Sequence, residues 1–245
     1  MVESGMTGAF LNAFAILLGS LFGLARRQPP SARAQNAFRS ALGALTVFFG
    51  LRLVWLSVGG TFTAVLKQLG FAVLAILLGN LLGKILRLQK ISNRLGRHAV
   101  ELIAATTKNP PGRPAAGFNA CATLFCAAPL GMLGAVADGL SGFFYLLAVK
   151  AVMDGLAMIS FVKMFRWPAA LAAMPVFIFF GLIAAVSHFF VAPFLDARHL
   201  TDPVNASIGL IACAVALVIF EVRKVELANY LPSLAVAPFL AWLAG

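Results

Sequence analysis

The sequence predicts an all-α integral membrane protein with about eight transmembrane helices. Hydrophobic residues make up 61% of the chain and charged residues 11%, whereas soluble domains contain about half and about a quarter of these classes. The apolar runs are long and unbroken, and about 20 such residues form a helix that spans the hydrocarbon core. They lack the alternation typical of a membrane β-barrel.

Each long apolar run is interpreted as one membrane-crossing helix. The predicted helices cover residues 6–25, 38–57, 64–86, 118–137, 142–164, 169–195, 204–222 and 227–244. The segments between them are too short for a soluble domain, apart from residues 84–117. We therefore expect one transmembrane domain, residues 1–245, with the lipid bilayer as its surroundings.

The basic residues predict the orientation of these helices. The net charge is +11, and most Lys and Arg residues follow the first, third, fifth and seventh predicted helices. Eight alternating helices place these loops on one side, and an excess of basic residues marks the cytoplasmic side. The expectation is a multi-pass protein of the bacterial inner (cytoplasmic) membrane with both termini outside. The charge then reflects topology, and no nucleic-acid partner is expected.

The segment 84–117 is predicted to be a basic cytoplasmic loop. In its first part Leu88, Ile91, Leu95 and Leu102 stand among basic residues, a pattern typical of an amphipathic helix on a membrane surface. The stretch 109–114 is rich in proline and reads as a helix-breaking linker. Contact with anionic lipid and a solvated connector both remain open for this loop.

Internal similarity suggests an inverted repeat. Residues 15–23 (AILLGSLFG) resemble residues 75–83 (AILLGNLLG), and both carry glycines four apart that let helices approach closely. Residues 69–83 also resemble 231–245, and 40–43 resemble 206–209, in helices of opposite predicted direction. Helices 1–3 and 6–8 then flank a central broken-helix pair, as in inverted-repeat transporters. Chance similarity between apolar sequences is the alternative, and the glycine faces are also compatible with a homodimer.

The fourth predicted helix carries residues that interrupt a regular backbone. Pro129, Gly131 and Gly134 lie near its middle and Asn119 near its start. Proline removes a backbone donor, so a kink or a break is expected here. Non-helical backbone at membrane depth is tolerated against protein or a watery cavity. A simple packing kink and a binding element are both open interpretations.

The fifth predicted helix contains the most unusual charges. Lys150 and Asp154 lie near its centre, four residues apart and so on one face. Each charge at that depth costs about 2.5–3.5 kcal/mol, and such residues usually face a polar pathway or a partner. The pair is either a functional site or an internal salt bridge between helices. Asp138, towards the outer end of the preceding helix, is either a gate or ion ligand or a solvated helix end.

Other polar residues give weaker signals. Asn12 and Asn80, on the first and third predicted helices, are interpreted as interhelical hydrogen-bonding groups or as substrate contacts. His188 is a lone histidine with a structural or a proton-relay role. Asn205 and Ser207 open the seventh predicted helix and fit a helix cap.

The patterns of several catalytic classes are missing from the sequence. The three cysteines form no CxxC pair or cluster with histidine, so no metal site and no disulfide framework is expected. A phosphate-binding loop and a nucleophile–base motif are also missing. We expect no enzyme activity and no cofactor.

Three stretches resemble a known family. GAFLNAFAILLGSLFG at the start, TLFCAAPLGMLGAVADGLSG with LLAVKAVMDGLAMISF in the middle, and the last two predicted helices are similar to the YqgA/YdfK-like bacterial inner-membrane proteins. The resemblance spans nearly the whole chain and implies a membrane architecture without an established activity. It carries over these positions: Asn12, Cys126, Gly131, Gly134, Asp138, Gly139, Lys150 and Asp154. At Phe143 and Lys84 the chain departs from the acidic residue usual in that family.

The leading functional hypothesis is a secondary transporter or permease for a small solute or ion. Its central polar site is expected on the fourth and fifth predicted helices, because the charged pair follows the helix with the break. An ion channel is the first alternative. A non-transporting membrane scaffold or regulator is the second, and it predicts a dry bundle in which the charged pair satisfies itself.

Overall fold

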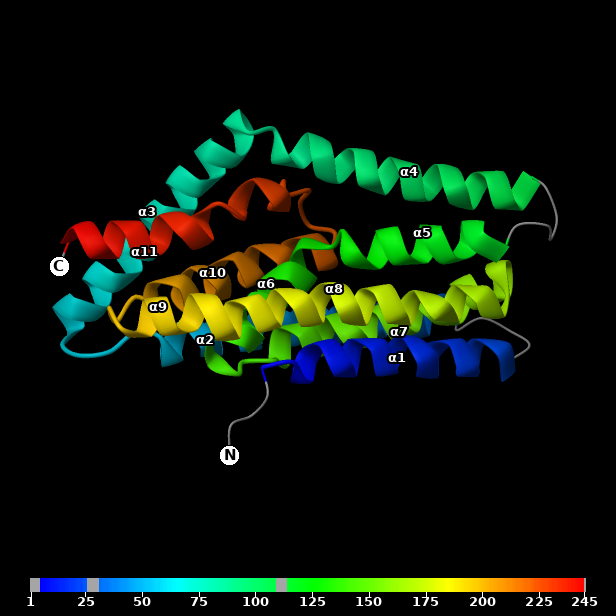
Figure 1. The fold of residues 1–245 in the computed structure, drawn as a ribbon, viewed down its shortest axis with the longest axis horizontal. Helices are drawn as coiled ribbons and strands as arrows, with labels where there is room; N and C mark the ends of the chain where they lie inside the picture. The colour runs from blue at the N-terminus through cyan, green and yellow to red at the C-terminus, as the bar shows by residue number, and fades with distance from the viewer. Residues whose placement is uncertain (1–4, 26–30, 109–113, 245) are drawn as a thin grey trace.

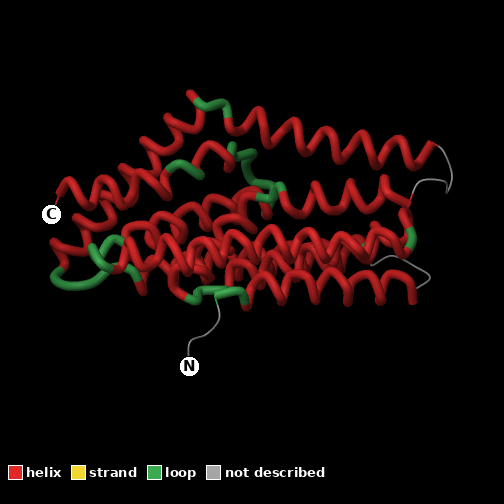
Figure 2. Tube along the Cα trace, viewed as in Figure 1, coloured by secondary structure: helices red, strands yellow, loops and turns green. Residues whose placement is uncertain are grey.

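Helices joined by short loops make up the protein. The computed structural model describes residues 5–25, 31–108 and 114–244, and this part of the chain contains no strand (Figure 2). The elements are α1 (Thr7–Ala25), α2 (Ala32–Leu56), α3 (Phe62–Ile85), α4 (Leu88–Lys108), α5 (Pro114–Cys126), α6 (Pro129–Ser141), α7 (Tyr145–Phe165), η1 (Trp167–Ala172), α8 (Ala173–Val186), η2 (Ser187–Val191), α9 (Ala192–Asp196), α10 (Thr201–Ile219), η3 (Leu227–Tyr230) and α11 (Ser233–Ala244).

Six helical segments of the described chain are long and apolar enough to cross a membrane. They are Thr7–Ala25, Arg33–Leu56, Phe62–Ile85, Tyr145–Phe165, Trp167–Asp196 and Thr201–Ile219. The bent pair α5–α6 makes a seventh span if it is counted as one, and the apolar segment Leu227–Leu243 is shorter. The predicted all-α fold with several apolar helices is confirmed, while the count of eight stays a prediction.

Several predicted helices differ from the observed elements: the second, 38–57, begins earlier, at Ala32, and the eighth, 227–244, is divided into η3 and α11. The fourth is divided at residues 127–128 into α5 and α6, which are bent by 60°. The seventh begins at Thr201, earlier than predicted, so the interpretation of Asn205 and Ser207 as caps is wrong. Ser207 lies inside α10, where its hydroxyl donates to the carbonyl of Pro203 over 2.9 Å. The apolar run continues through Pro203 because proline is tolerated in the first turn of a helix.

The predicted amphipathic segment is the helix α4, which packs along α5 (Figure 1). Its start is attached to η3 by two hydrogen bonds of 3.1 Å: Gln89 N–H donates to Asn229 Oδ1, and Ala228 N–H donates to Gln89 Oε1. Ile91 and Leu95 are exposed. The linker 109–113 and the side chain of Leu102 lie outside the described residues, and location on the inner membrane surface stays a prediction.

Glycines set the distance between α1 and α7, which lie side by side (Figure 1). A Cβ on Gly19 would overlap the carbonyl oxygen of Gly155, and one on Gly23 would overlap Val162 and the backbone of Ile159. Because 19 pairs with 155 and 23 with 159, the two helices run in the same direction. The small-residue spacing of α1 therefore serves close backbone packing against α7.

Two further pairs of helices, α3 with α11 and α2 with α10, also pack through glycine, but the two helices of each pair are antiparallel. Gly79 of α3 lies against Ser233 of α11, and Gly83 lies against Asn229 of η3. In α2 and α10, Gly50 meets Gly209. The helix α3 is antiparallel to the η3–α11 segment, because the contacted residue moves from Ser233 back to Asn229 as α3 advances from Gly79 to Gly83. Gly43 lies against Phe220, so the same holds for α2 and α10.

The shared direction of α1 and α7 bears on the broken pair. Between them the chain makes three traversals: α2, then α3 with α4, which continues from α3 toward the same end of the bundle (Figure 1), and then α5–α6. An odd number of traversals between two helices makes the second one parallel to the first. The pair α5–α6 therefore carries the chain from one end of the bundle to the other, and does not return it to the end from which it came.

We predict opposite effects for two glycine-to-alanine substitutions. Gly19→Ala inserts a methyl group against the backbone of Gly155, and such overpacking typically costs about 1–3 kcal/mol. At Gly70 in the middle of α3 nothing lies within 4 Å of an added Cβ, so Gly70→Ala is expected to keep or raise stability through helix propensity. Thermal unfolding of both purified variants in detergent measures this. Equal melting temperatures would contradict the packing role of Gly19.

Candidate functional site

A buried ion pair lies at the centre of α7. Lys150 Nζ donates to Asp154 Oδ2, and the two residues are 2% and 6% exposed. Both sit on one face because they are separated by four residues of a helix. They are buried because α7 contacts α1, α2, α5 and α6 at once. An ion pair in this environment is stable only when both members stay paired.

Two aromatic rings flank the ammonium group. Lys150 Nζ lies 5.6 Å from the ring centroid of Phe125, at the end of α5, and 5.6 Å from that of Phe180 in α8. A cation within about 6 Å of a ring face is attracted by the ring quadrupole. The lysine therefore has two sources of stabilisation, the carboxylate of Asp154 and the pair of rings.

Asn12 of α1 completes the polar group. It is 0% exposed, and its amide lies within interaction range of the Asp154 carboxylate. The geometry falls outside that of a normal hydrogen bond, however, and neither Oδ1 nor Nδ2 of Asn12 has a hydrogen-bond partner. Leaving a buried polar group unsatisfied costs about 1–3 kcal/mol. Such a group in a native protein calls for an explanation, for example an ion or a water molecule.

The helix break lies next to this polar group. Cys126, the last residue of α5, is within electrostatic range of both Lys150 and Asp154. Pro129 occupies the first turn of α6, where its missing N–H is not needed. Gly131 makes room for the ring of Phe180, which a Cβ at 131 would overlap. The predicted break is thus confirmed, and it adjoins the charged pair.

Asp138 is buried in the C-terminal part of α6. It is 1% exposed, so the solvated helix end is wrong. The backbone N–H of Gly8 donates to Asp138 Oδ2 over 2.8 Å. A carboxylate is favourable there because it satisfies an N–H at the start of α1 and complements the helix dipole. Nearby, His188 Nδ1 lies 3.2 Å from the carbonyl oxygen of Gly139.

The remaining predicted site residues have different places. Gly134 packs against the backbone of Leu147 in α7, and Asn119 is exposed on α5, away from the pair. Sequence reasoning missed Phe125, Phe180 and Gly8. Aromatic residues and glycines are abundant in this chain, with 22 of each of Phe and Gly, so no local signal distinguishes these three.

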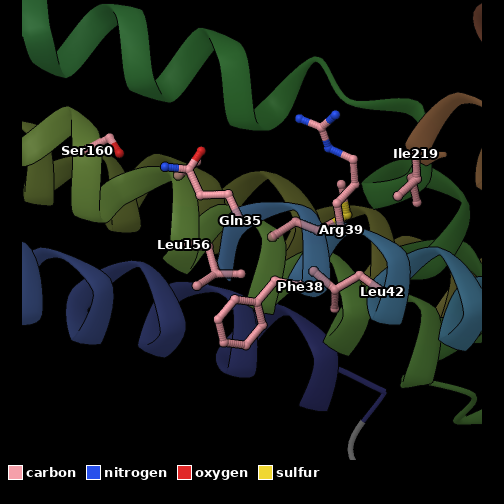
Figure 3. A pocket seen from close by; sticks show the side chains of 9 residues that line it. Gln35, Phe38, Arg39, Leu42, Leu156, Ser160 and Ile219 are labelled. Atoms are coloured by element: carbon pink, nitrogen blue, oxygen red, sulfur yellow. The ribbon is translucent and has the colours of Figure 1, made fainter. Parts of the chain in front are cut away.

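A pocket of about 240 Å³ lies on another face of α7. Figure 3 shows its lining, which α2 supplies together with α7 and the end of α10: Gln35, Phe38, Arg39, Leu42, Met153, Leu156, Ala157, Ser160 and Ile219. The charged group at its rim is Arg39, which forms an exposed ion pair with Glu221. Met153 precedes Asp154, but its side chain points to α2 while the aspartate points to α1.

We predict that the charged pair is required as a unit. Lys150→Ala leaves the Asp154 carboxylate buried without its partner, a change that typically costs about 3–5 kcal/mol. Replacing both residues together, as in Lys150→Met with Asp154→Leu, is expected to restore most of the loss. Lys67→Ala in exposed α3 serves as the control for removal of a lysine. Unfolding in detergent measures all three, and a double variant no more stable than Lys150→Ala would contradict the prediction.

The chain matches one family over nearly its full length. The family described as "Protein of unknown function (DUF554)" matches residues 7–242. The uncharacterized protein YqgA of Escherichia coli (strain K12) is 29% identical over 240 residues, which cover 97% of each chain. The uncharacterized membrane protein YdfK of Bacillus subtilis (strain 168) is 24% identical over 241 residues, 97% of this chain and 96% of the relative.

The matched length includes every element of the polar site. No solved structure matches the chain significantly. The family match runs from the start of α1 to α11, so it covers Asn12, Lys150 and Asp154. The chain is a membrane protein that belongs to the DUF554 family of proteins of unknown function.

Proposed function

We propose that this protein is a secondary transporter for a small solute or ion. The carrying observation is Asn12, a fully buried amide beside a buried ion pair with both of its polar atoms unsatisfied. A purely structural bundle gains nothing from such a group, because an apolar side chain of similar volume would avoid its cost. A binding site benefits from it, since the amide supplies one donor group and one acceptor to a ligand.

The broken helix supports this proposal. Residues 127–128 interrupt the helix between α5 and α6. They directly follow Cys126, which lies within electrostatic range of both Lys150 and Asp154. Discontinuous helices place backbone dipoles at the substrate and ion sites of many transporters. Here the break and the charged pair are adjacent in space, although Lys150 lies 22 positions after Ala128 along the chain.

The packing of the outer helices also supports it. The first three long helices each contact a counterpart among the last three: α1 with α8, α2 with α10 and α3 with α11. The helices α1 and α8 run in opposite directions, since Ala9 lies near Gly181 and Gly5 lies near His188, just after α8. The other two pairs are also antiparallel. Two triplets related by an axis in the membrane plane produce this pairing, which is the arrangement of inverted repeats.

A membrane scaffold is the second candidate. The observation in its favour is the low exposure of Lys150 and Asp154, which satisfy one another inside the bundle. A scaffold needs no change of access, whereas a carrier must open this region in another conformation. The two functions therefore differ in a measurable property, the movement of solute across a membrane.

We expect proteoliposomes with the wild-type protein to take up a solute that empty liposomes exclude. Stopped-flow light scattering after osmotic steps tests NaCl, KCl, sodium acetate, urea and glycerol in turn. Uptake by a carrier saturates with concentration. Asp154→Asn removes a charge that the site needs, so uptake is expected to fall at least about tenfold, the factor that corresponds to 1.4 kcal/mol.

The matched control is Glu221→Gln, which neutralises a carboxylate of an exposed ion pair instead. Its uptake is expected to stay near that of the wild type, because exposed pairs contribute little. Equal uptake by Asp154→Asn and wild type would remove the pair from the mechanism. Uptake of none of the five solutes would favour the scaffold, and large unsaturable currents in planar bilayers would favour a channel.

A further inference from the structure

We infer that the central site binds a small monovalent cation, which replaces the ammonium group of Lys150 on the carboxylate of Asp154. This inference rests on the proposed function and names its substrate class. The ligands are the Asp154 carboxylate and the amide oxygen of Asn12. Both are oxygen groups, the type that hard cations prefer.

The ligand groups around Asp154 suit a cation better than an anion. The groups on the elements around Asp154 are Lys150 on its own helix, Asn12 on α1, Cys126 and Phe125 on α5, and Phe180 on α8. Asp154 is the acidic group of this set, and Lys150 is its single fixed cation. An anion would meet the Asp154 carboxylate, whereas a cation meets that carboxylate and the Asn12 amide oxygen, while the Lys150 ammonium keeps its contacts with the rings of Phe125 and Phe180.

Lys150 acts as the built-in competitor. Its ammonium lies between the rings of Phe125 and Phe180, each 5.6 Å away, and these retain a cation–π attraction when the carboxylate is taken by another ion. The lysine side chain is long and flexible, so its head group moves without a change in the backbone. The bound cation and the ammonium therefore occupy the carboxylate in turn, which is the exchange that a carrier requires.

Asn12 gains a contact for its amide oxygen in this exchange. With Lys150 on Asp154, both polar atoms of Asn12 are buried without partners. A cation between Asn12 Oδ1 and Asp154 gives the amide oxygen its missing contact. Cation binding thus relieves the free-energy cost of leaving the Asn12 amide oxygen unsatisfied, and this relief adds to the affinity for the ion.

Acidic and polar groups continue from the site towards the beginning of α1. Asn12 and Gly8 lie one turn apart on α1, and the N–H of Gly8 binds the carboxylate of Asp138. The next residue, Gly139, contacts His188, which is half-buried in the π-helical turn η2. Such turns within α-helices occur often at functional sites. Asp138 therefore places a second carboxylate between the periphery at His188 and Asn12.

The test is cation-dependent stability of the purified protein in detergent. Melting temperature is measured with LiCl, NaCl or KCl, and choline chloride at equal ionic strength corrects for screening. A cation that binds the native state raises the melting temperature with concentration. We expect one of the three alkali cations to raise it with saturation, and choline to leave it unchanged.

Two variants identify the site. Asn12→Ala removes the amide ligand and is expected to raise the half-saturating cation concentration about tenfold or more. Asn205→Ala removes another buried asparagine with an unpartnered Oδ1, on α10, and is expected to keep the wild-type response. Asp154→Asn is expected to abolish the response, and measuring its unfolding without salt shows whether it still folds.

The outcomes separate this inference from the proposed function. No alkali-cation response in the wild-type protein, or an equal response in Asn12→Ala and wild type, overturns the cation site. Saturable uptake of urea or glycerol without any cation response leaves the transporter standing and overturns the cation as its substrate. A cation response lost in Asn12→Ala, without uptake of any solute, supports the site and overturns the transporter.

Discussion

Two opposite charges are buried inside an apolar bundle, and the packing of the surrounding helices has to keep them paired. Lys150 and Asp154 are shielded from the surroundings by the helices packed around α7. Neither charge is tolerable alone at that depth, because water is not there to solvate it. The position of α7 among its neighbours and the spacing of its two charged residues are therefore linked. A shift of α7 by one residue relative to its neighbouring helices would place one of the two charges against apolar side chains.

Close glycine packing brings the helices around this region together. Gly19 and Gly155 bring the backbones of α1 and α7 together, and this contact also brings Asn12 alongside Asp154. Lipid tails are as apolar as the helix surfaces, so association in a membrane relies on tight packing rather than on hydrophobic burial. The same contacts that hold the helices together thus define the polar group. The helix pairs α2–α10 and α3–α11 use glycine in the same way at a distance from it.

The irregular backbone is concentrated around the same region. The α5–α6 break adjoins the charged pair, and the π-helical turn η2 lies beside the end of α6. Between the two, Asp138 binds the start of α1. Strained or interrupted segments persist where surrounding structure holds them, and they often coincide with function. In this protein they surround one side of α1, which is where the proposed substrate meets the chain.

Much of this arrangement is predictable from the sequence. Long apolar runs require helices because a membrane leaves no other partner for backbone N–H and C=O groups. Proline and glycine predict the break near Pro129, because they weaken a helix wherever they occur together. The burial and pairing of Lys150 and Asp154 follow from their four-residue spacing in an apolar helix. Each of these features is a local property of a few neighbouring residues.

The helices, the break and the charged pair on α7 can therefore be predicted from local sequence patterns. Three sets of contacts become visible in the folded protein alone: Asn12 faces Asp154, Phe125 and Phe180 flank Lys150, and Asp138 binds Gly8. These contacts join residues of different helices, and apolar helix surfaces carry little information about their partners. Which faces meet depends on the glycines that let two backbones approach, and many glycines in the chain look alike in sequence.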